Sequence, residues 1–251
     1  LDMQRVRGAR IGIIFQEPST SLNPVMSVGR QVTEVIERHT ALRGAAARTR
    51  AIEWFERVGL PEPRRRFDTY PFQMSGGQKQ RVMIALALAA EPDLLIADEP
   101  TTALDVTIQG QILELLVELQ RDQGMGMLLI THDLGIVHGM AHRVALMYAG
   151  QIVEKGAAKQ AVFDPLHPYA KGLMGSIIVP ESGLRDVKLT AIPGVPPNLK
   201  NPPSGCRFAE RCKYVRPECR ATSIPLYELE DGRAYRCILS EKDLRKAYQN
   251  G

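Results

Sequence analysis

Long apolar runs are absent from this 251-residue sequence. The longest one, at residues 82–90, has nine residues, too few to cross a bilayer. The N-terminal stretch LDMQRVRGARIG carries basic residues but no apolar segment, so we do not expect a secretory signal. Cysteine is missing from the first four fifths of the chain. The formal net charge of +4 is mild and does not argue for a nucleic-acid partner.

The remaining pattern alternates short apolar strands with helices. Strands are expected at residues 10–18, 94–97, 127–131 and 144–148, with a further strand after the turn at 149–156. Helices are expected at residues 28–58 (with a break at LRGAAA), 78–90, 106–122 and 134–140. This alternation predicts an α/β fold with a mostly parallel sheet. Beyond residue 160, proline and glycine become frequent and the periodicity fades.

The stretch MSGGQKQR, residues 74–81, places a serine and two glycines at the start of an expected helix. A helix N-terminus has unpaired N–H groups and partial positive charge. Because Gly76 and Gly77 have no side chains, an anion can approach the backbone, and Ser75 can add a hydrogen bond. Alone, the pattern better fits a tight turn with a serine N-cap. The acidic motif twenty residues later favours the anion site.

Polar side chains follow three of the expected strands. Asp98 and Glu99 end the strand in LLIADEP, Gln16 follows IGIIF, and His132 follows MLLIT. Ligands bind α/β sheets at the carboxyl ends of strands. Asp98 suits Mg²⁺, which prefers hard oxygen ligands, and Glu99 is placed to polarise a water for attack on a phosphoryl group. Taken singly, the two acids could belong to an ordinary loop, and the histidine could have a structural role. Because polar residues follow all three strands, we predict that they form one site.

Together these stretches resemble the motifs of ABC ATPases. FQEP resembles the Q-loop, SGGQKQR the signature motif, LLIADEPTTALD the Walker B motif with the D-loop, and THD the H-loop. Order and spacing match over residues 1 to about 160. The resemblance implies a P-loop NTPase core with an inserted helical subdomain. It also implies four residues that contact the γ-phosphate held by the opposite subunit of a dimer: Ser75, Gly76, Gly77 and Gln78.

The same resemblance implies roles for the residues at the strand ends. Gln16 would sense Mg²⁺ and the water, Asp98 would order the Mg²⁺ ion, and Glu99 would be the general base. His132 would hold the γ-phosphate. Asp105 would belong to the D-loop that crosses the dimer interface. ATP and Mg²⁺ are therefore the implied cofactors.

One motif that this family needs is missing from the sequence. A Walker A loop, G-x-x-x-x-G-K-[ST], should precede the Q-loop, and GARIGIIF has neither its lysine nor its spacing. The aromatic residue that stacks on adenine is also unassigned. We therefore expect the chain to be the C-terminal portion of a longer subunit. By itself it should bind ATP poorly, because that loop supplies most of the grip on phosphate.

The tail resembles the C-terminal extension of dipeptide and oligopeptide importer ATPases. The resemblance rests on DPLHPYAKGLMGSI at 164–177 and LTAIPGVPPNLKNPPSGCRFAERC at 189–212. It implies a peripheral subunit at the cytoplasmic face of the cell (inner) membrane that powers peptide import. The implied partners are a second ATPase subunit in a head-to-tail dimer, two membrane permease subunits and, indirectly, an extracytoplasmic peptide-binding protein, with no nucleic acid.

The motifs divide the chain into four expected segments. Residues 1–16 and 76–160 would belong to the ATPase core. Residues 17–75 would form the helical subdomain, which together with the Q-loop receives the permease. Residues 161–251 would form the peptide-importer extension with its four cysteines.

Three alternatives stay open at this point. Importers of nickel or glutathione carry similar ATPases. A non-transport ABC ATPase acting on DNA is disfavoured by dispersed basic residues and by the lack of a coiled-coil insertion between the motifs. A non-hydrolysing regulatory fragment would be compatible with the missing Walker A loop.

The four cysteines, Cys206, Cys212, Cys219 and Cys237, follow the spacing C-x5-C-x6-C-x17-C. Such clustering without a signal peptide favours metal ligation over a disulfide framework. Structural zinc usually uses closely spaced cysteine pairs, and none is present, so we expect a [4Fe–4S] cluster ahead of Zn²⁺. The resemblance to peptide-importer ATPases also implies an iron–sulfur cluster. Reduced thiols in a loose tail are the alternative.

Overall fold

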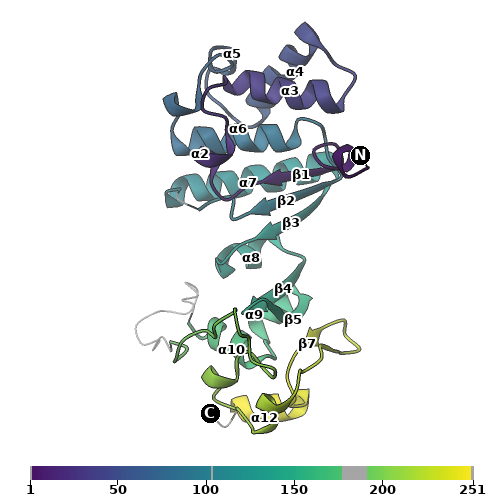
Figure 1. The fold of residues 1–251 in the computed structure, drawn as a ribbon, viewed down its shortest axis with the longest axis vertical. Helices are drawn as coiled ribbons and strands as arrows, with labels where there is room; N and C mark the ends of the chain where they lie inside the picture. The colour runs from purple at the N-terminus through teal and green to yellow at the C-terminus, as the bar shows by residue number, and fades with distance from the viewer. Residues whose placement is uncertain (1, 103, 177–190, 250–251) are drawn as a thin grey trace. The chain divides into compact units, whose positions relative to one another are not determined.

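The structure is a computed structural model that describes residues 2–102, 104–176 and 191–249. The chain divides into two compact units, residues 1–132 and 133–251 (Figure 1). Each unit has a β-sheet of its own and separate hydrophobic clusters.

The N-terminal unit is built on a three-stranded parallel sheet. Its strands are β1 (Ile11–Ile14), β2 (Leu94–Asp98) and β3 (Gly126–Ile130), in that order across the sheet. Pairing is parallel from the first residue of each strand, so the three carboxyl ends meet at one edge. The expected parallel α/β core is confirmed in this unit.

Helices pack in layers against this sheet. The helices of this unit are α1 (Asp2–Val6), α2 (Pro18–Ser21), α3 (Val28–His39), α4 (Gly44–Arg57), α5 (Pro63–Arg66), the 3-10 turn η1 (Pro71–Gln73), α6 (Gly76–Leu88) and α7 (Val106–Gln123). In Figure 1, α6 and α7 lie along the sheet, and α3 and α4 stack on α6. One core joins these layers, because the fully buried side chains of Leu95, Trp54, Ile84 and Leu116 belong to a single hydrophobic cluster.

Local sequence explains how α6 and α7 begin and end. Ser75 caps α6 reciprocally: its Oγ accepts from the N–H of Gln78 at 3.3 Å, and Oε1 of Gln78 accepts from the N–H of Ser75 at 3.1 Å. Oδ1 of Asp105 accepts from the N–H of Ile108 at 3.0 Å and caps α7. Gly124, with a left-handed φ of 61°, ends α7.

The C-terminal unit has a four-stranded antiparallel sheet in the order β4-β5-β7-β6. Its strands are β4 (Arg143–Tyr148), β5 (Gln151–Ala157), β6 (Tyr227–Glu228) and β7 (Ala234–Tyr235). The expected strand at 144–148 is therefore present, but it pairs in a hairpin instead of extending the parallel sheet. Ala149 and Gly150 both have positive φ, 48° and 78°, which is the backbone of a tight two-residue hairpin turn.

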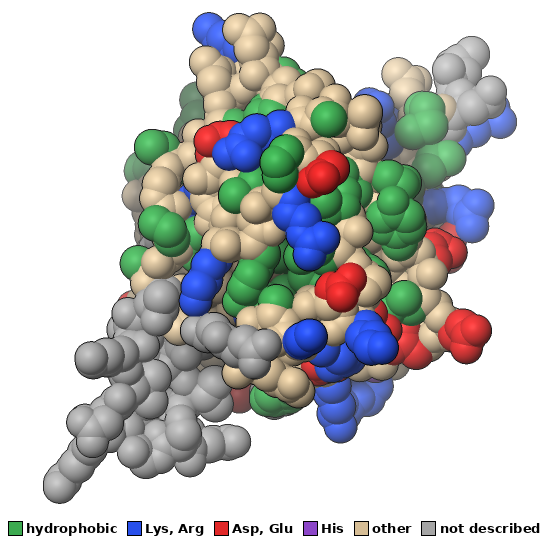
Figure 2. All heavy atoms as spheres, turned by 90° about the horizontal axis from the view of Figure 1, so that it is seen from below, with side chains coloured by type: hydrophobic (Ala, Val, Ile, Leu, Met, Phe, Trp, Pro, Cys, Tyr) green, Lys and Arg blue, Asp and Glu red, His purple; other side chains and the backbone are tan. Residues whose placement is uncertain are grey.

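Short helices complete the C-terminal unit. They are α8 (Leu134–Met140), α9 (Ala158–Phe163), α10 (Pro168–Met174), the 3-10 turn η2 (Ala209–Arg211), α11 (Glu218–Ala221) and α12 (Glu241–Gln249). On the face shown in Figure 2, basic and acidic side chains lie among hydrophobic ones. Within the described residues, no helix combines the length and the apolar character needed to cross a membrane.

Candidate active site

The carboxylate of Glu99 is the centre of a polar cluster at the carboxyl edge of the parallel sheet. Nε2 of Gln16 donates to Oε2 of Glu99 at 2.8 Å, and Oγ1 of Thr102 donates to the same oxygen at 2.7 Å. Nδ1 of His132 lies 3.1 Å from Oε1. The structure thus brings together Gln16, Glu99 and His132, which follow three adjacent strands.

Hydrogen bonding favours the charged form of this carboxylate. The hydrogen bond from Thr102, followed by the one with His132, lowers the pKa of Glu99 below its ordinary value. Glu99 is therefore ionised at neutral pH, as a general base must be. Its backbone has a left-handed φ of 45°, a conformation that costs a non-glycine residue about 1–3 kcal/mol and that is concentrated at functional sites.

Asp98, the last residue of β2, lies next to Glu99 in sequence and is half-buried. Its register partner in β3 is Ile130, whose carbonyl oxygen accepts from the N–H of Glu99 at 2.9 Å. The side chains of Asp98, at the end of β2, and Gln16, after β1, have oxygen atoms at the same sheet edge. Oxygen atoms of this kind are the ligands that Mg²⁺ prefers, so these residues fit that ion.

The signature residues form a second group at the N-terminus of α6. The cap uses a lone pair on Oγ of Ser75 and the Oε1 atom of Gln78. The cap does not use the hydroxyl hydrogen of Ser75 or Nε2 of Gln78. Both groups are donors and can form hydrogen bonds to an anion. A Cβ on Gly77 would lie 3.1 Å from the side chain of Ile108 in α7, whereas one on Gly76 would meet only ordinary contact. Within the described residues, no hydrogen bond joins this group to the Glu99 cluster.

The turn between β2 and α7 is fixed by its own contacts. The carbonyl oxygen of Thr101 accepts from Nε2 of Gln109 and from the N–H of Leu104, both at 3.3 Å. Thr101 is buried, and Asp105 caps the helix that follows. Sequence reasoning missed Thr102 in this turn, although its place three residues after Glu99 is a usable signal.

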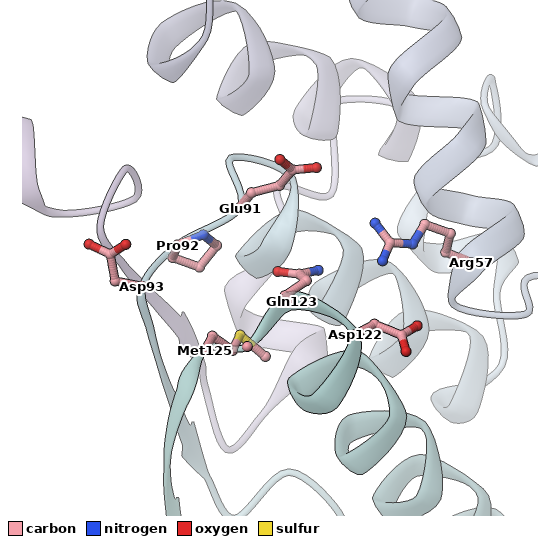
Figure 3. Close-up of a pocket in the computed structure, with 8 residues that line it drawn as sticks. Arg57, Glu91, Pro92, Asp93, Asp122, Gln123 and Met125 are labelled. Carbon is pink, nitrogen blue, oxygen red and sulfur yellow. The ribbon is translucent and has the colours of Figure 1, made fainter.

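A cavity of about 470 Å³ opens at the opposite edge of the same unit (Figure 3). It is lined by the turns that precede β2 and β3 and by the end of α4, including Arg57, Asp93, Asp122 and Gln123. Asp93 is paired with Arg10, whose Nε lies 2.7 Å from Oδ2. None of the cavity's lining residues in the described chain belongs to the Glu99 cluster, so this cavity is not part of the candidate site.

The four cysteines do not form a metal site. All four are free thiols, and within residues 2–102, 104–176 and 191–249 no three side chains of His, Cys, Asp or Glu are arranged to hold a metal ion. The predicted [4Fe–4S] cluster on Cys206, Cys212, Cys219 and Cys237 is therefore wrong. The alternative of Zn²⁺ lacks a ligand set for the same reason.

The cysteine side chains pack among apolar residues instead of binding a metal. Cys237 packs in one hydrophobic cluster with Tyr235 and Leu244, whereas Cys206 and Cys212 pack against a different one. Burial raises the pKa of Cys212 to about 12 and that of Cys237 to about 11, so both stay protonated at neutral pH. A protonated, buried thiol behaves as a small apolar side chain.

Direct backbone contacts hold the cysteine-containing loops. The N–H of Cys206 donates to the carbonyl oxygen of Cys219 at 2.7 Å. A Cβ on Gly205 would lie 2.2 Å from that same oxygen, so only glycine permits this approach. Nη2 of Arg211 also donates to the carbonyl oxygen of Ile192 at 3.1 Å. These hydrogen bonds connect the cysteine-containing loops to one another and to the segment around Ile192.

Comparison with known proteins assigns the class. The sequence model of the ABC transporter family matches residues 2–102. A dimeric structure of the ATP-binding cassette MJ0796 bound to ADP and Pi superposes with a TM-score of 0.56 at 31% identity, over 62% of this chain and 66% of that chain. The fold is that of an ATP-binding cassette, which confirms the expected fold class. ABC ATPases use ATP and Mg²⁺.

Matches to the tail and to the whole chain identify the branch of the ABC transporter family. The model of the oligopeptide/dipeptide transporter C-terminal region matches residues 153–219. The oligopeptide transport ATP-binding protein OppD of Bacillus subtilis is 51% identical over 98% of this chain and 68% of its own length. The dipeptide transport ATP-binding protein DppD of Escherichia coli is 47% identical over 94% of this chain and 74% of its own length. The chain belongs to the ATP-binding proteins of ABC transporters, in the oligopeptide/dipeptide branch.

Proposed function

We propose that this chain supplies the ATP-hydrolysing machinery of an importer for dipeptides or oligopeptides. One observation carries the proposal: an ionised Glu99 carboxylate is held at the carboxyl edge of the sheet by Gln16, Thr102 and His132. The names of the relatives supply the transported class, since they are oligopeptide and dipeptide transport proteins.

The site residues divide the chemistry among them. Glu99 takes a proton from the water that attacks the γ-phosphate of ATP. Asp98 and Gln16 would hold Mg²⁺, which neutralises phosphate charge when bound. His132, whose side chain is 78% exposed beside the carboxylate, donates to the γ-phosphate. Each of these residues ends or follows a strand of the sheet, so the sheet fixes their spacing.

The second group serves a partner subunit. We assign the donors of the α6 N-terminus, Ser75, Gly76, Gly77 and Gln78, to the γ-phosphate bound by the opposite subunit of a head-to-tail dimer. The partial positive charge of that helix end favours an anion there. Asp105, in the turn before α7, lies at the dimer interface in this arrangement. Hydrolysis would then require both subunits.

The helical layer would carry the contact with the membrane. We assign residues 17–75 as the helical subdomain, residues 1–16 and 76–160 to the ATPase core, and 161–251 to the extension. Val25, which is 83% exposed, supports a docking surface for one of two permease subunits. The subunit would lie at the cytoplasmic face of the membrane, and a peptide-binding protein would deliver substrate from the other side.

Glu99→Gln in the full-length subunit, assembled with its partners, tests this proposal. ATP should still bind, and the dimer should accumulate in its closed state. Turnover should fall about 10²–10⁴-fold, the usual contribution of a general base. Glu118→Gln makes the same chemical change at an exposed position in α7 and should keep wild-type turnover. Near wild-type turnover in Glu99→Gln would contradict the assignment.

A further inference from the structure

The hydroxyl of Thr102 makes the shortest of the three contacts to the Glu99 carboxylate, at 2.7 Å. It shares Oε2 with the Nε2 atom of Gln16, whereas Oε1 has His132 as its neighbour at 3.1 Å. A carboxylate offers about four lone-pair positions, two on each oxygen. Two donors therefore fill Oε2, and Oε1 keeps capacity for a further donor such as a water molecule.

Thr102 differs from the other two neighbours in how it is held. Gln16 and His132 come from separate segments that follow β1 and β3. Thr102 lies in the same turn as Glu99, and its N–H donates to the carbonyl oxygen of Glu99 at 3.1 Å. That turn is tied to α7 through the buried Thr101 and Nε2 of Gln109. Of the three neighbours of the Glu99 carboxylate, Thr102 is therefore the one whose position depends least on movement of the neighbouring loops.

We propose that Thr102 is a positioning residue for hydrolysis: its hydroxyl occupies Oε2 of Glu99 and so presents Oε1 to the attacking water. The inference rests on the proposed function of Glu99 as general base. Thr102 itself touches neither ATP nor water in this account. Its loss would let the carboxylate rotate about its terminal bond, which is a soft torsion, and would lower the fraction of productive geometries.

Three variants in the full-length, assembled transporter test the inference. Thr102→Val removes the hydroxyl and keeps the branched shape, whereas Thr102→Ser keeps the hydroxyl. Thr49→Val makes the same change as the first variant at an exposed position in α4. Thr102→Val should lower kcat about tenfold or more with the KM for ATP unchanged, since the lost hydrogen bond is to a charged group. Thr102→Ser should restore kcat to within about twofold by the same hydrogen bond, and Thr49→Val should match wild type.

A double variant separates this inference from the proposed function. If Thr102 acts through Glu99, adding Thr102→Val to Glu99→Gln should produce no further loss of turnover. A further tenfold loss, a wild-type kcat in Thr102→Val, or a Thr102→Ser variant as slow as Thr102→Val would overturn the inference. Wild-type turnover in Glu99→Gln alone would instead overturn the general-base assignment. If Thr102→Val fails to fold, Thr102→Ala, alone and combined with Glu99→Gln, tests the same loss of the hydroxyl.

Discussion

Nε2 of Gln16 donates to Oε2 of Glu99 at 2.8 Å, although the two residues are 83 positions apart. Gln16 follows β1 and leads into the helical layer, whereas Glu99 follows β2. The hydrogen bond therefore couples the start of the helical layer to the carboxylate. A shift of that loop would therefore lengthen or break the hydrogen bond to Oε2 of Glu99.

The rate of ATP hydrolysis should depend on the charge of the side chain at position 16. Gln16→Ala removes one donor and should slow ATP turnover about tenfold, the value of one hydrogen bond to a charged group. Gln16→Glu places a second carboxylate against Glu99, and like charges this close disfavour ionisation of the pair. The glutamate variant should therefore be clearly slower than the alanine variant in steady-state ATPase assays at neutral pH. Equal rates in the two variants would mean that this contact does not act on the carboxylate.

Ser75→Asp should separate the capping role of Ser75 from its proposed role toward phosphate. Aspartate caps helices about as well as serine, so the thermal stability of the protein should be unchanged. A carboxylate at the N-terminus of α6 would repel the γ-phosphate of the opposite site, and ATP turnover should fall about 10²-fold or more. Ser75→Asn, a neutral cap, is the matched control and should lose much less. A fast, stable aspartate variant would return Ser75 to a structural role.

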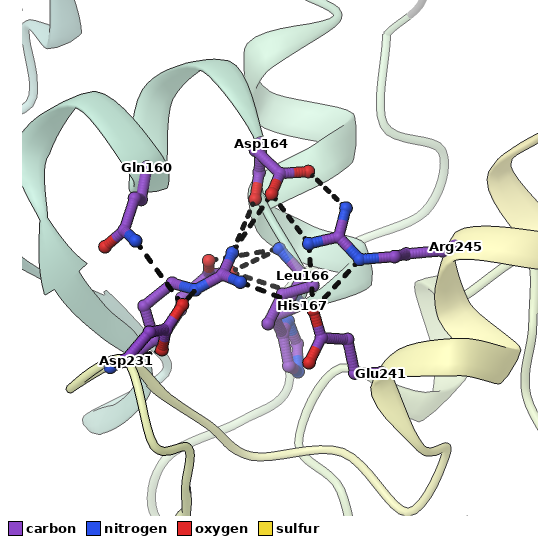
Figure 4. A network of polar contacts seen from close by, with 9 residues as sticks. Gln160, Asp164, Leu166, His167, Asp231, Glu241 and Arg245 are labelled. Carbon is purple, nitrogen blue, oxygen red and sulfur yellow. Dashed lines mark hydrogen bonds and ion pairs between the residues drawn. The ribbon is translucent and has the colours of Figure 1, made fainter.

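An ion-pair network anchors α12 in the C-terminal unit (Figure 4). Both terminal nitrogens of Arg245 lie 2.7 Å from the two carboxylate oxygens of Asp164. Arg233, whose side chain is only 7% exposed, pairs with Asp164 at 3.1 Å, with Asp231 at 2.6 Å and with Glu241 at 3.3 Å. Asp164 therefore joins the helix that contains Arg245 to the buried Arg233.

Asp164→Asn should destabilise the C-terminal unit by about 1–2 kcal/mol at neutral pH. The change removes a charge that faces two arginines, one of them buried, but Asp164 is itself about half exposed, which weakens the effect. Six of the seven tyrosines lie in this unit, so urea denaturation followed by tyrosine circular dichroism reports on it. Glu228→Gln breaks the exposed pair with Lys155 and should cost less than about 0.5 kcal/mol.

The same variant should change how stability depends on pH. Hydrogen bonds from Arg245 lead the causes that hold the pKa of Asp164 below its ordinary value of 3.8. The unfolded chain therefore binds the proton at higher pH than the folded chain does, so this contribution is complete above about pH 5 and is lost in acid. The difference between wild type and Asp164→Asn should shrink at pH 3. An equal difference at pH 3 and pH 7 would show that the charge of Asp164 is not responsible.

The N-terminal unit follows from the sequence because its signals are local and strong. Gln16, Glu99 and His132 each follow an expected strand, and parallel strands bring their carboxyl ends to one edge of the sheet. Ser75 fitted a helix N-cap in the sequence, and α6 and α7 both start within two residues of the expected positions. Such features depend on periodicity and capping, which nearby residues determine.

The remaining structure depends on contacts that spacing does not reveal. Strands β6 and β7 have two residues each, too short to give a periodic pattern, and they form by pairing with β5. The contact of Thr102 with Glu99 depends on the shape of one turn. Clustered cysteines suggested a metal, but in the fold Cys237 packs in one hydrophobic cluster and Cys206 and Cys212 pack against another. Their proximity in sequence carried no information about ligand geometry.

The most direct test of the account is ATP-driven uptake of a labelled oligopeptide into vesicles that contain the assembled full-length transporter. Wild-type subunit should support uptake that depends on ATP, and Glu99→Gln should abolish uptake while ATP remains bound. Nickel and glutathione, supplied in parallel, should not accumulate. Peptide uptake that continues in Glu99→Gln, or ATP-driven uptake of nickel or glutathione but not of peptide by the wild type, would contradict the account.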